Sequence, residues 1–165
     1  MMRHVISAPA TIDVSALAGR LARNAAVLRD PSRRLCESYG YQTLYEVPVV
    51  LQKRLRREAM RLHAQALRSR ADAVCDHSVF ALLADWMRWL WSETPAQEWD
   101  SILEEASAAV DLSEAIHHVV DGPRAAYDGY RWLDLRNAAQ TDRLMRGLYR
   151  EFRCESRVKE ERVKR

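Results

Sequence analysis

The sequence is poor in the residues that mark several classes of protein. Its 165 residues include only five glycines and five prolines, which disfavours turn-rich all-β architectures. The three cysteines, Cys36, Cys75 and Cys154, are widely spaced and odd in number, so they predict no disulfide framework and favour a reducing cytoplasm. The longest apolar stretch, residues 79–91, is too short to span a bilayer, and the N-terminus lacks the apolar core of a signal peptide. We therefore expect a cytoplasmic protein with no membrane partner.

What the sequence does contain favours helices. Apolar residues make up 48% and charged residues 30% of the chain, an ordinary balance for one globular domain with a real core. Ala, Leu and Arg dominate, and all three are good helix formers. The pattern predicts an all-α fold, a single-domain helical bundle of about five to seven helices over residues 1–152, followed by a charged C-terminal extension, residues 153–165.

Apolar spacing and capping residues define the expected helices. They are predicted over residues 13–28, 31–39, 47–70, 79–92, 95–110, 111–120 and 124–152, with residues 1–12 irregular. The helix that begins near Val79 is apolar around nearly its whole circumference, which is typical of the centre of a bundle. We expect the core to contain Trp86, Leu90, Leu83, Trp99, Leu103, Leu55 and Leu62.

The segment 53–70 carries the clearest functional signal. It holds seven basic residues against the single acid Glu58, a net charge of +6, whereas the whole chain carries +3. At about 100° per residue, five of these cations share one side of a helix, opposite a stripe of leucine and alanine. Cations one turn apart can contact successive phosphates. The predicted nucleic-acid-binding residues are Lys53, Arg54, Arg57, Arg61 and Arg68.

An acidic segment offers another interpretation of this basic ridge. Residues 93–121 contain eight acids and no lysine or arginine. The ridge can therefore pair with the acidic segment inside one molecule, or with the same segment of a second copy in head-to-tail self-association. A third interpretation is a solvated helix face.

Other groups of residues give weaker evidence for a metal site or a catalytic site. Glu114 and His117 form one Glu-x-x-His pair, but a di-iron bundle needs two such pairs, so a helix cap explains them better. Cys75 and His77 lack the usual zinc-ligand spacing. The chain contains no phosphate loop, G-x-G-x-x-G, G-x-S-x-G or metalloprotease motif, so we expect no cofactor and no metal.

The leading hypothesis is a non-catalytic adaptor subunit. It would dock with the protein subunits of a larger assembly and lay the 53–70 helix along a nucleic-acid backbone. The first alternative is a protein–protein interaction module, such as an immunity, anti-defence or regulatory protein, that uses the acidic segment or the Trp-rich helix. The second alternative is a helical ribonuclease that uses Arg57 and His63, a pair that any Arg-rich sequence can contain by chance. The motifs leave no positive reason to propose catalysis, and they point to no known family.

Overall fold

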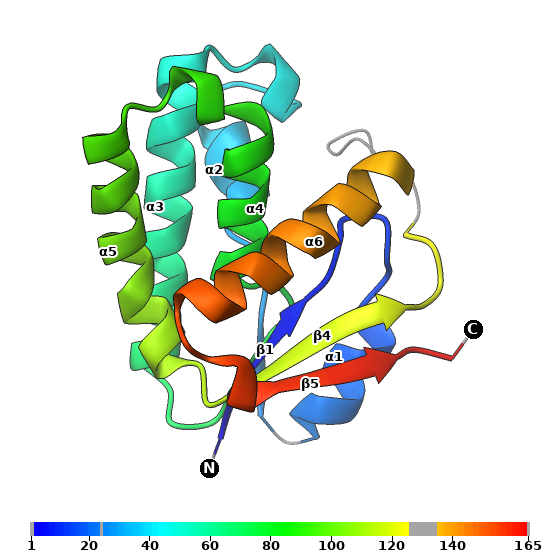
Figure 1. The fold of residues 1–165 in the computed structure, drawn as a ribbon. Helices are drawn as coiled ribbons and strands as arrows, with labels where there is room; N and C mark the ends of the chain where they lie inside the picture. Colours follow the sequence, from blue (N-terminus) through cyan, green and yellow to red (C-terminus); the bar gives the residue numbers. More distant parts are fainter. Residues whose placement is uncertain (1, 24, 126–134, 165) are drawn as a thin grey trace.

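A five-stranded parallel β-sheet lies at the centre of the computed structural model, so the fold is α/β and the prediction of an all-α helical bundle is wrong. The structure describes residues 2–23, 25–125 and 135–164. The strand order is β2–β3–β1–β4–β5, and every neighbouring pair is parallel. Figure 1 shows helices on both faces of the sheet, with α6 crossing one face and α1 behind the other. The strands are β1 (Arg3–Ser7), β2 (Ala26–Leu28), β3 (Ala73–Cys75), β4 (Ala115–Asp121) and β5 (Val158–Arg162).

The helices occupy much of the rest of the described chain. They are α1 (Ser15–Ala22), α2 (Ser32–Ser38), α3 (Val49–Arg68), α4 (Val79–Trp89), α5 (Ala96–Leu112) and α6 (Leu135–Glu151), with 3-10 turns η1 (Leu44–Glu46), η2 (Trp91–Glu93) and η3 (Glu155–Arg157). Helices α2–α5 gather at one end of the molecule, away from β5 (Figure 1). Among the described residues, no helix combines the length and the apolar composition that a membrane crossing requires.

The missed strands are short and pair only with distant parts of the chain. Strands β2 and β3 have three residues each, fewer than a periodicity argument needs. In β1, His4 pairs with Val74 on one side and with Ala115 on the other. Helical spacing predicts the end of a helix over residues 26–28 and a short helix over residues 111–120, and both predictions are wrong where β2 and β4 form. The run Ala115–Val119 is buried from both sides, as the strands of a parallel sheet are, so it lacks the alternation of a half-exposed strand.

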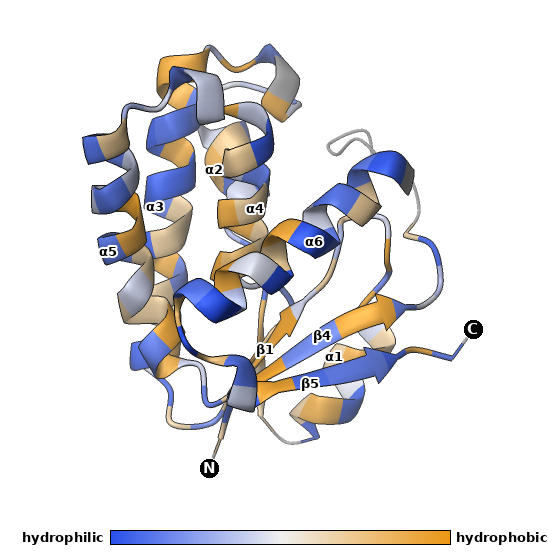
Figure 2. Ribbon diagram, viewed as in Figure 1, coloured by the Kyte–Doolittle hydropathy of each residue, from blue (hydrophilic) through white to orange (hydrophobic). Residues whose placement is uncertain are grey.

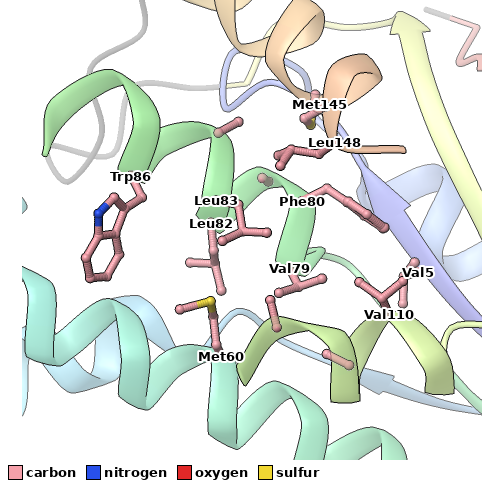
Figure 3. Close-up of a cluster of buried hydrophobic side chains, with 14 of the residues drawn as sticks. Val5, Met60, Val79, Phe80, Leu82, Leu83, Trp86, Val110, Met145 and Leu148 are labelled. Carbon is pink, nitrogen blue, oxygen red and sulfur yellow. The ribbon is translucent and has the colours of Figure 1, made fainter. Parts of the chain in front are cut away.

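Both faces of the sheet are covered, and alternate residues of each strand belong to different cores. Ile6, Val74 and Val119 pack with α1 residues such as Leu17 and Ala18 in one cluster. The larger cluster lies on the other face and combines Val5, Cys75 and Ile116 with residues of α3–α6. Figure 3 shows Val5 beside Val79, Phe80 and Val110 in this larger core.

Helix α4 is the centre of the larger core, as its all-round apolar sequence predicts. Seven of its eleven residues are buried, and Ser78 caps its N-terminus by accepting a hydrogen bond from the Ala81 N–H. The expected core residues Trp86, Leu90, Leu83 and Leu55 are at most 2% exposed. Trp99 and Leu103 are partly buried against that core, and Leu62 is half-buried.

The C-terminal residues belong to the sheet. Residues 158–162, which the charge pattern placed in an extension, form the edge strand β5 beside β4. Strand β5 is largely hydrophilic whereas β4 is largely apolar (Figure 2), as expected for an edge strand next to a buried one. Residues 126–134 of the predicted 124–152 helix lie outside the described residues, and α6 begins at Leu135.

Candidate ligand-binding pocket

A pocket of about 210 Å³ opens at the carboxyl edge of the sheet. The segments that follow three neighbouring strands contribute to its wall: Ala8 and Thr11 after β1, Asp30 after β2 and His77 after β3. Residues of α2, η1, α3, α4 and α6 complete it. In open α/β sheets, ligands bind in the crevice at the carboxyl ends of the strands. The topology therefore places this pocket where a ligand is expected.

Arg56 of α3 is the least solvated cation in the pocket wall. It is only 5% exposed, and its Nε has no hydrogen-bond partner in the part of the chain that the structure describes. The nearest acid is Asp85 of α4, whose Oδ2 lies 3.9 Å from Arg56 Nη1, beyond hydrogen-bond distance. Burial of a guanidinium costs several kcal/mol unless charge and hydrogen bonds compensate it. An anionic ligand would supply that compensation.

Arg88 of α4 is a second cation in the wall. Its Nη1 donates a hydrogen bond of 2.9 Å to Thr141 Oγ1 of α6, and its guanidinium lies 4.8 Å from the centre of the Trp89 ring. The buried Nε of Arg88, like that of Arg56, has no partner among the described residues. Trp89 also lines the pocket and is 46% exposed. This part of the wall therefore offers both a cation and an aromatic surface.

Two histidines lie close to an acid on the β2–β3 side. His77 Nδ1 is 3.8 Å from Asp30 Oδ2, and the buried His77 Nε2 has no partner within the described chain. His63 of α3 lies behind them, and complete burial lowers its pKa to about 4, with the nearby His77 acting in the same direction. His63 is therefore neutral at pH 7.

Next to the pocket residues Ala8, His77 and Thr141, a chain of polar groups joins α4 and α6 to the sheet. Ser7 Oγ lies 3.0 Å from Ser78 Oγ and 2.8 Å from the Tyr149 hydroxyl. That hydroxyl lies 2.8 Å from His118 Nδ1, and His118 Nε2 donates to Asp142 across 2.7 Å. Burial lowers the pKa of His118 more than Asp142 raises it. Because these groups satisfy one another, they hold the pocket walls in place.

The predicted basic ridge faces helix α5 in part. Lys53 Nζ contacts Glu98 at 2.7 Å. Arg57 forms a bidentate ion pair with Glu105, which raises the pKa of the Arg57 guanidinium. Arg61 lies 3.8 Å from the same Glu105 and is 60% exposed. These contacts match the internal pairing that the charge pattern also allowed.

The other two residues of the ridge point elsewhere. Arg54 is exposed and lies 5.9 Å from the centre of the Tyr39 ring. Arg68 is exposed at the end of α3. Nucleic-acid binding through this helix stays a prediction, and it now rests mainly on Arg54, Arg61 and Arg68.

The weaker constellations separate in space. Arg57 faces α5, whereas His63 is buried on the pocket side of the same helix, so the two do not meet at one site. His117 lies in β4 between His4 and Glu161, with 2.9 Å to each. Cys75 is buried in β3, where desolvation raises its pKa to about 12. Among the described residues, no group of three or more His, Cys, Asp or Glu side chains is arranged to hold a metal ion.

The residues predicted from the sequence to bind a ligand did not include Arg56, although Arg56 lies inside the basic segment 53–70. At 100° per residue, Arg56 and His63 fall at the border between the leucine stripe and the cations. In the structure the buried face of α3 is turned from the expected leucine stripe and is centred near these two residues. Its buried residues are Leu55, Arg56, Ala59, Met60, His63, Ala64 and Leu67. The remaining pocket residues come from segments more than 100 positions apart, such as Ala8 and Thr141, so no local pattern connects them.

Comparison with known proteins supports the fold assignment. No protein-family model matches the sequence, and no curated protein matches it. Two solved structures of NadR protein, one in complex with NAD and AMP-PNP and the other in complex with NR, resemble it with a TM-score of 0.69 each. The sequence identities are 12% and 13%, over 96% and 97% of this chain. The chain spans only 44% and 43% of those NadR chains. At this identity the likeness shows a shared Rossmann-like α/β fold.

Proposed function

We propose that this chain binds a small anionic ligand of the nucleotide class in the carboxyl-edge pocket, with Arg56 and Arg88 as its anion contacts. The observation that carries the proposal is the burial of Arg56 with an unpartnered Nε and only one distant carboxylate. Arginine suits phosphate and carboxylate because its planar donors can bind two oxygens at once. The position of the pocket at the carboxyl edge agrees with this role.

The likeness to NadR supports the nucleotide class. The two NadR structures were obtained with NAD, AMP-PNP and NR as ligands. Trp89 at the pocket wall suits the planar ring of such a ligand. The pocket is smaller than the roughly 300–1,000 Å³ that holds drug-sized molecules, which favours one nucleotide unit over two.

Calorimetric titration of the full chain with AMP tests the proposal. We expect binding that weakens at least tenfold in Arg56→Gln and in Arg88→Gln, because each variant removes a charged donor. Arg54→Gln is the matched control, since Arg54 lies on the same helix but outside the pocket wall. If the full chain binds neither AMP nor NAD at millimolar concentration, or if the two pocket variants bind as the control does, the proposal is wrong.

We also propose a reducing compartment such as the cytoplasm. The support is chemical: Cys36, Cys75 and Cys154 are buried and carry free thiols. Burial raises the pKa of all three thiols, so they behave as inert core residues. A disulfide in the protein purified from its host under alkylating conditions would contradict this proposal.

A further inference from the structure

The turn between β1 and α1 is built differently from a phosphate-binding turn. In nucleotide-binding α/β folds, glycines in this turn expose backbone N–H groups, and the phosphate sits at the N-terminus of the following helix. Here residues 8–14 contain no glycine, and Pro9 has no N–H to offer. The Ile12 N–H donates to the Pro9 carbonyl at 3.0 Å, and the Asp13 N–H donates to the Pro123 carbonyl at 2.8 Å. These two donors are therefore already used within the protein.

An acid of the chain itself occupies the anion position at α1. Asp13 Oδ1 accepts a hydrogen bond of 2.9 Å from the N–H of Ser15, the first residue of the helix. This contact lowers the pKa of Asp13, so the carboxylate is charged at pH 7. A negative charge is favourable beside the positive end of the helix dipole. A phosphate brought to the same place would meet that charge.

The turn is also fastened to the segment that follows β4. Ile12 forms an antiparallel bridge with Arg124, and the Ala125 N–H donates to the Thr11 carbonyl at 2.9 Å. A methyl group added at Gly122 would lie 2.9 Å from Ile12 Cγ2, so the two segments are in close contact. The turn therefore lacks the freedom to wrap around a chain of phosphates.

The opposite wall of the pocket has room for one anionic group. Arg56, which is buried, and Arg88, which is half-buried with a buried Nε, line it, and both come from the α3–α4 side. Asp30 and Asp85 also line the pocket, and they disfavour any additional negative charge there. Trp89 stands beside Arg88.

From this arrangement we infer that the ligand is a nucleoside monophosphate, and that nucleoside triphosphates are excluded because the β1–α1 turn is closed by its own backbone bonds and by Asp13. This inference rests on the proposed function, since it names the ligand class of the same pocket. The single phosphate binds between Arg56 and Arg88, and the base lies against Trp89. The chain thus uses the carboxyl edge of the fold without the phosphate turn.

Titrating the full chain with AMP and with AMP-PNP, each with and without Mg²⁺, separates this inference from the proposed function. We expect AMP to bind at least tenfold more tightly than AMP-PNP, with no gain for AMP-PNP from Mg²⁺. If AMP-PNP binds as tightly as AMP, the inference is wrong while the proposed function stands. If neither binds but NAD does, the inference is again wrong while the proposed function stands. If none of the three binds, both are wrong.

An Asp13 variant tests the role of the carboxylate. Asp13→Asn keeps an oxygen that can accept from the Ser15 N–H but removes the charge. We expect its affinity for AMP-PNP to rise several-fold while its affinity for AMP is unchanged. Asp72→Asn is the matched control, because it removes the same charge at the opposite edge of the sheet, just before β3. Equal affinities of the two variants for AMP-PNP would overturn the role that we assign to Asp13.

Discussion

At the scale of a single residue, Arg56 is expected to favour ligand binding while lowering the stability of the fold. Arg56 is only 5% exposed, and the one acid near it lies 3.9 Å away. Its burial therefore lowers the free energy of unfolding. Replacing such a buried ion by an apolar side chain of similar volume is often neutral, or stabilising by about 1–4 kcal/mol. We therefore predict that Arg56→Met keeps or raises the free energy of unfolding, measured by urea denaturation, while AMP affinity falls by about 10- to 100-fold.

The matched control for this prediction is Arg57→Met, one residue further along α3. Arg57 is paired with Glu105, so its loss should lower stability and leave AMP affinity unchanged. A marked loss of stability in Arg56→Met would show that Asp85 satisfies Arg56 in the folded chain. Arg56 would then have a structural role, and the proposed anion site would be wrong.

His63 makes stability depend on pH. Its pKa is about 4 in the folded chain and near 6.5 when unfolded, so the unfolded chain binds the proton more tightly. Stability is therefore complete above pH 6.5 and falls as the pH drops from 6.5 towards 4, by about 3 kcal/mol in all. Between pH 7.5 and 5.5 the urea midpoint should move down by the equivalent of about 1 kcal/mol.

His63→Leu should remove most of that pH dependence, because leucine fills a similar buried space without titrating. His118→Leu is unsuitable as a control, since it removes a hydrogen-bond partner from both Asp142 and Tyr149. If the His63→Leu variant keeps the full pH dependence between 7.5 and 5.5, another group controls it.

At the scale of elements, the contact between α3 and α5 decides what the basic ridge does. Arg57 and Glu105 are about three-quarters buried in their pair. We predict that Arg57→Glu lowers the free energy of unfolding by about 1–2 kcal/mol, because it places two acids face to face. The double variant Arg57→Glu with Glu105→Arg should recover most of the loss. Arg68→Glu is the control, since Arg68 is exposed.

The exposed cations of α3 give a separate test of the nucleic-acid prediction. With Lys53 and Arg57 engaged by α5, three exposed or half-engaged cations remain for phosphate contacts: Arg54, Arg61 and Arg68. Anisotropy titrations of a single-stranded RNA should then give a log–log salt slope no steeper than about −2. Binding that is absent at low salt, or unchanged in a triple charge-reversal variant, would rule out this helix as a nucleic-acid surface.

At the scale of the whole molecule, a ligand in the pocket should stabilise the entire fold. The pocket wall combines the carboxyl edge of the sheet with α3, α4 and α6, so a bound ligand joins elements from both ends of the sequence. At 100 times its Kd, a ligand of the native state adds about 2.7 kcal/mol. For a chain of this length that corresponds to a rise in Tm of about 5–10 °C, which a thermal melt with AMP measures. Arg56→Gln should show no such rise.

The sequence by itself determined three of the helices and which of them lies at the centre of the core. Helical periodicity is a local property, so α3, α4 and α5 were predicted near their observed bounds, and the all-round apolar sequence of α4 placed it in the core. The separation of the basic segment from the acidic segment was also visible in the sequence. That the two pair in part within one molecule became clear only from the packing of α5 against α3. The lack of a phosphate-loop motif was evident from the residues alone.

Only the tertiary structure decided the sheet and the pocket. Strands of three to seven residues carry too little pattern to identify, and β1 acquires its stability from Val74 and Ala115, which lie about 70 and 110 positions away. Helix α3 shows the same limit, because its neighbours in the fold bury a side centred near Arg56 and His63, and this side is turned from the expected leucine stripe. Burial and parallel pairing both depend on contacts between segments far apart in the sequence. The local spacing of residues does not predict which of these segments pack together.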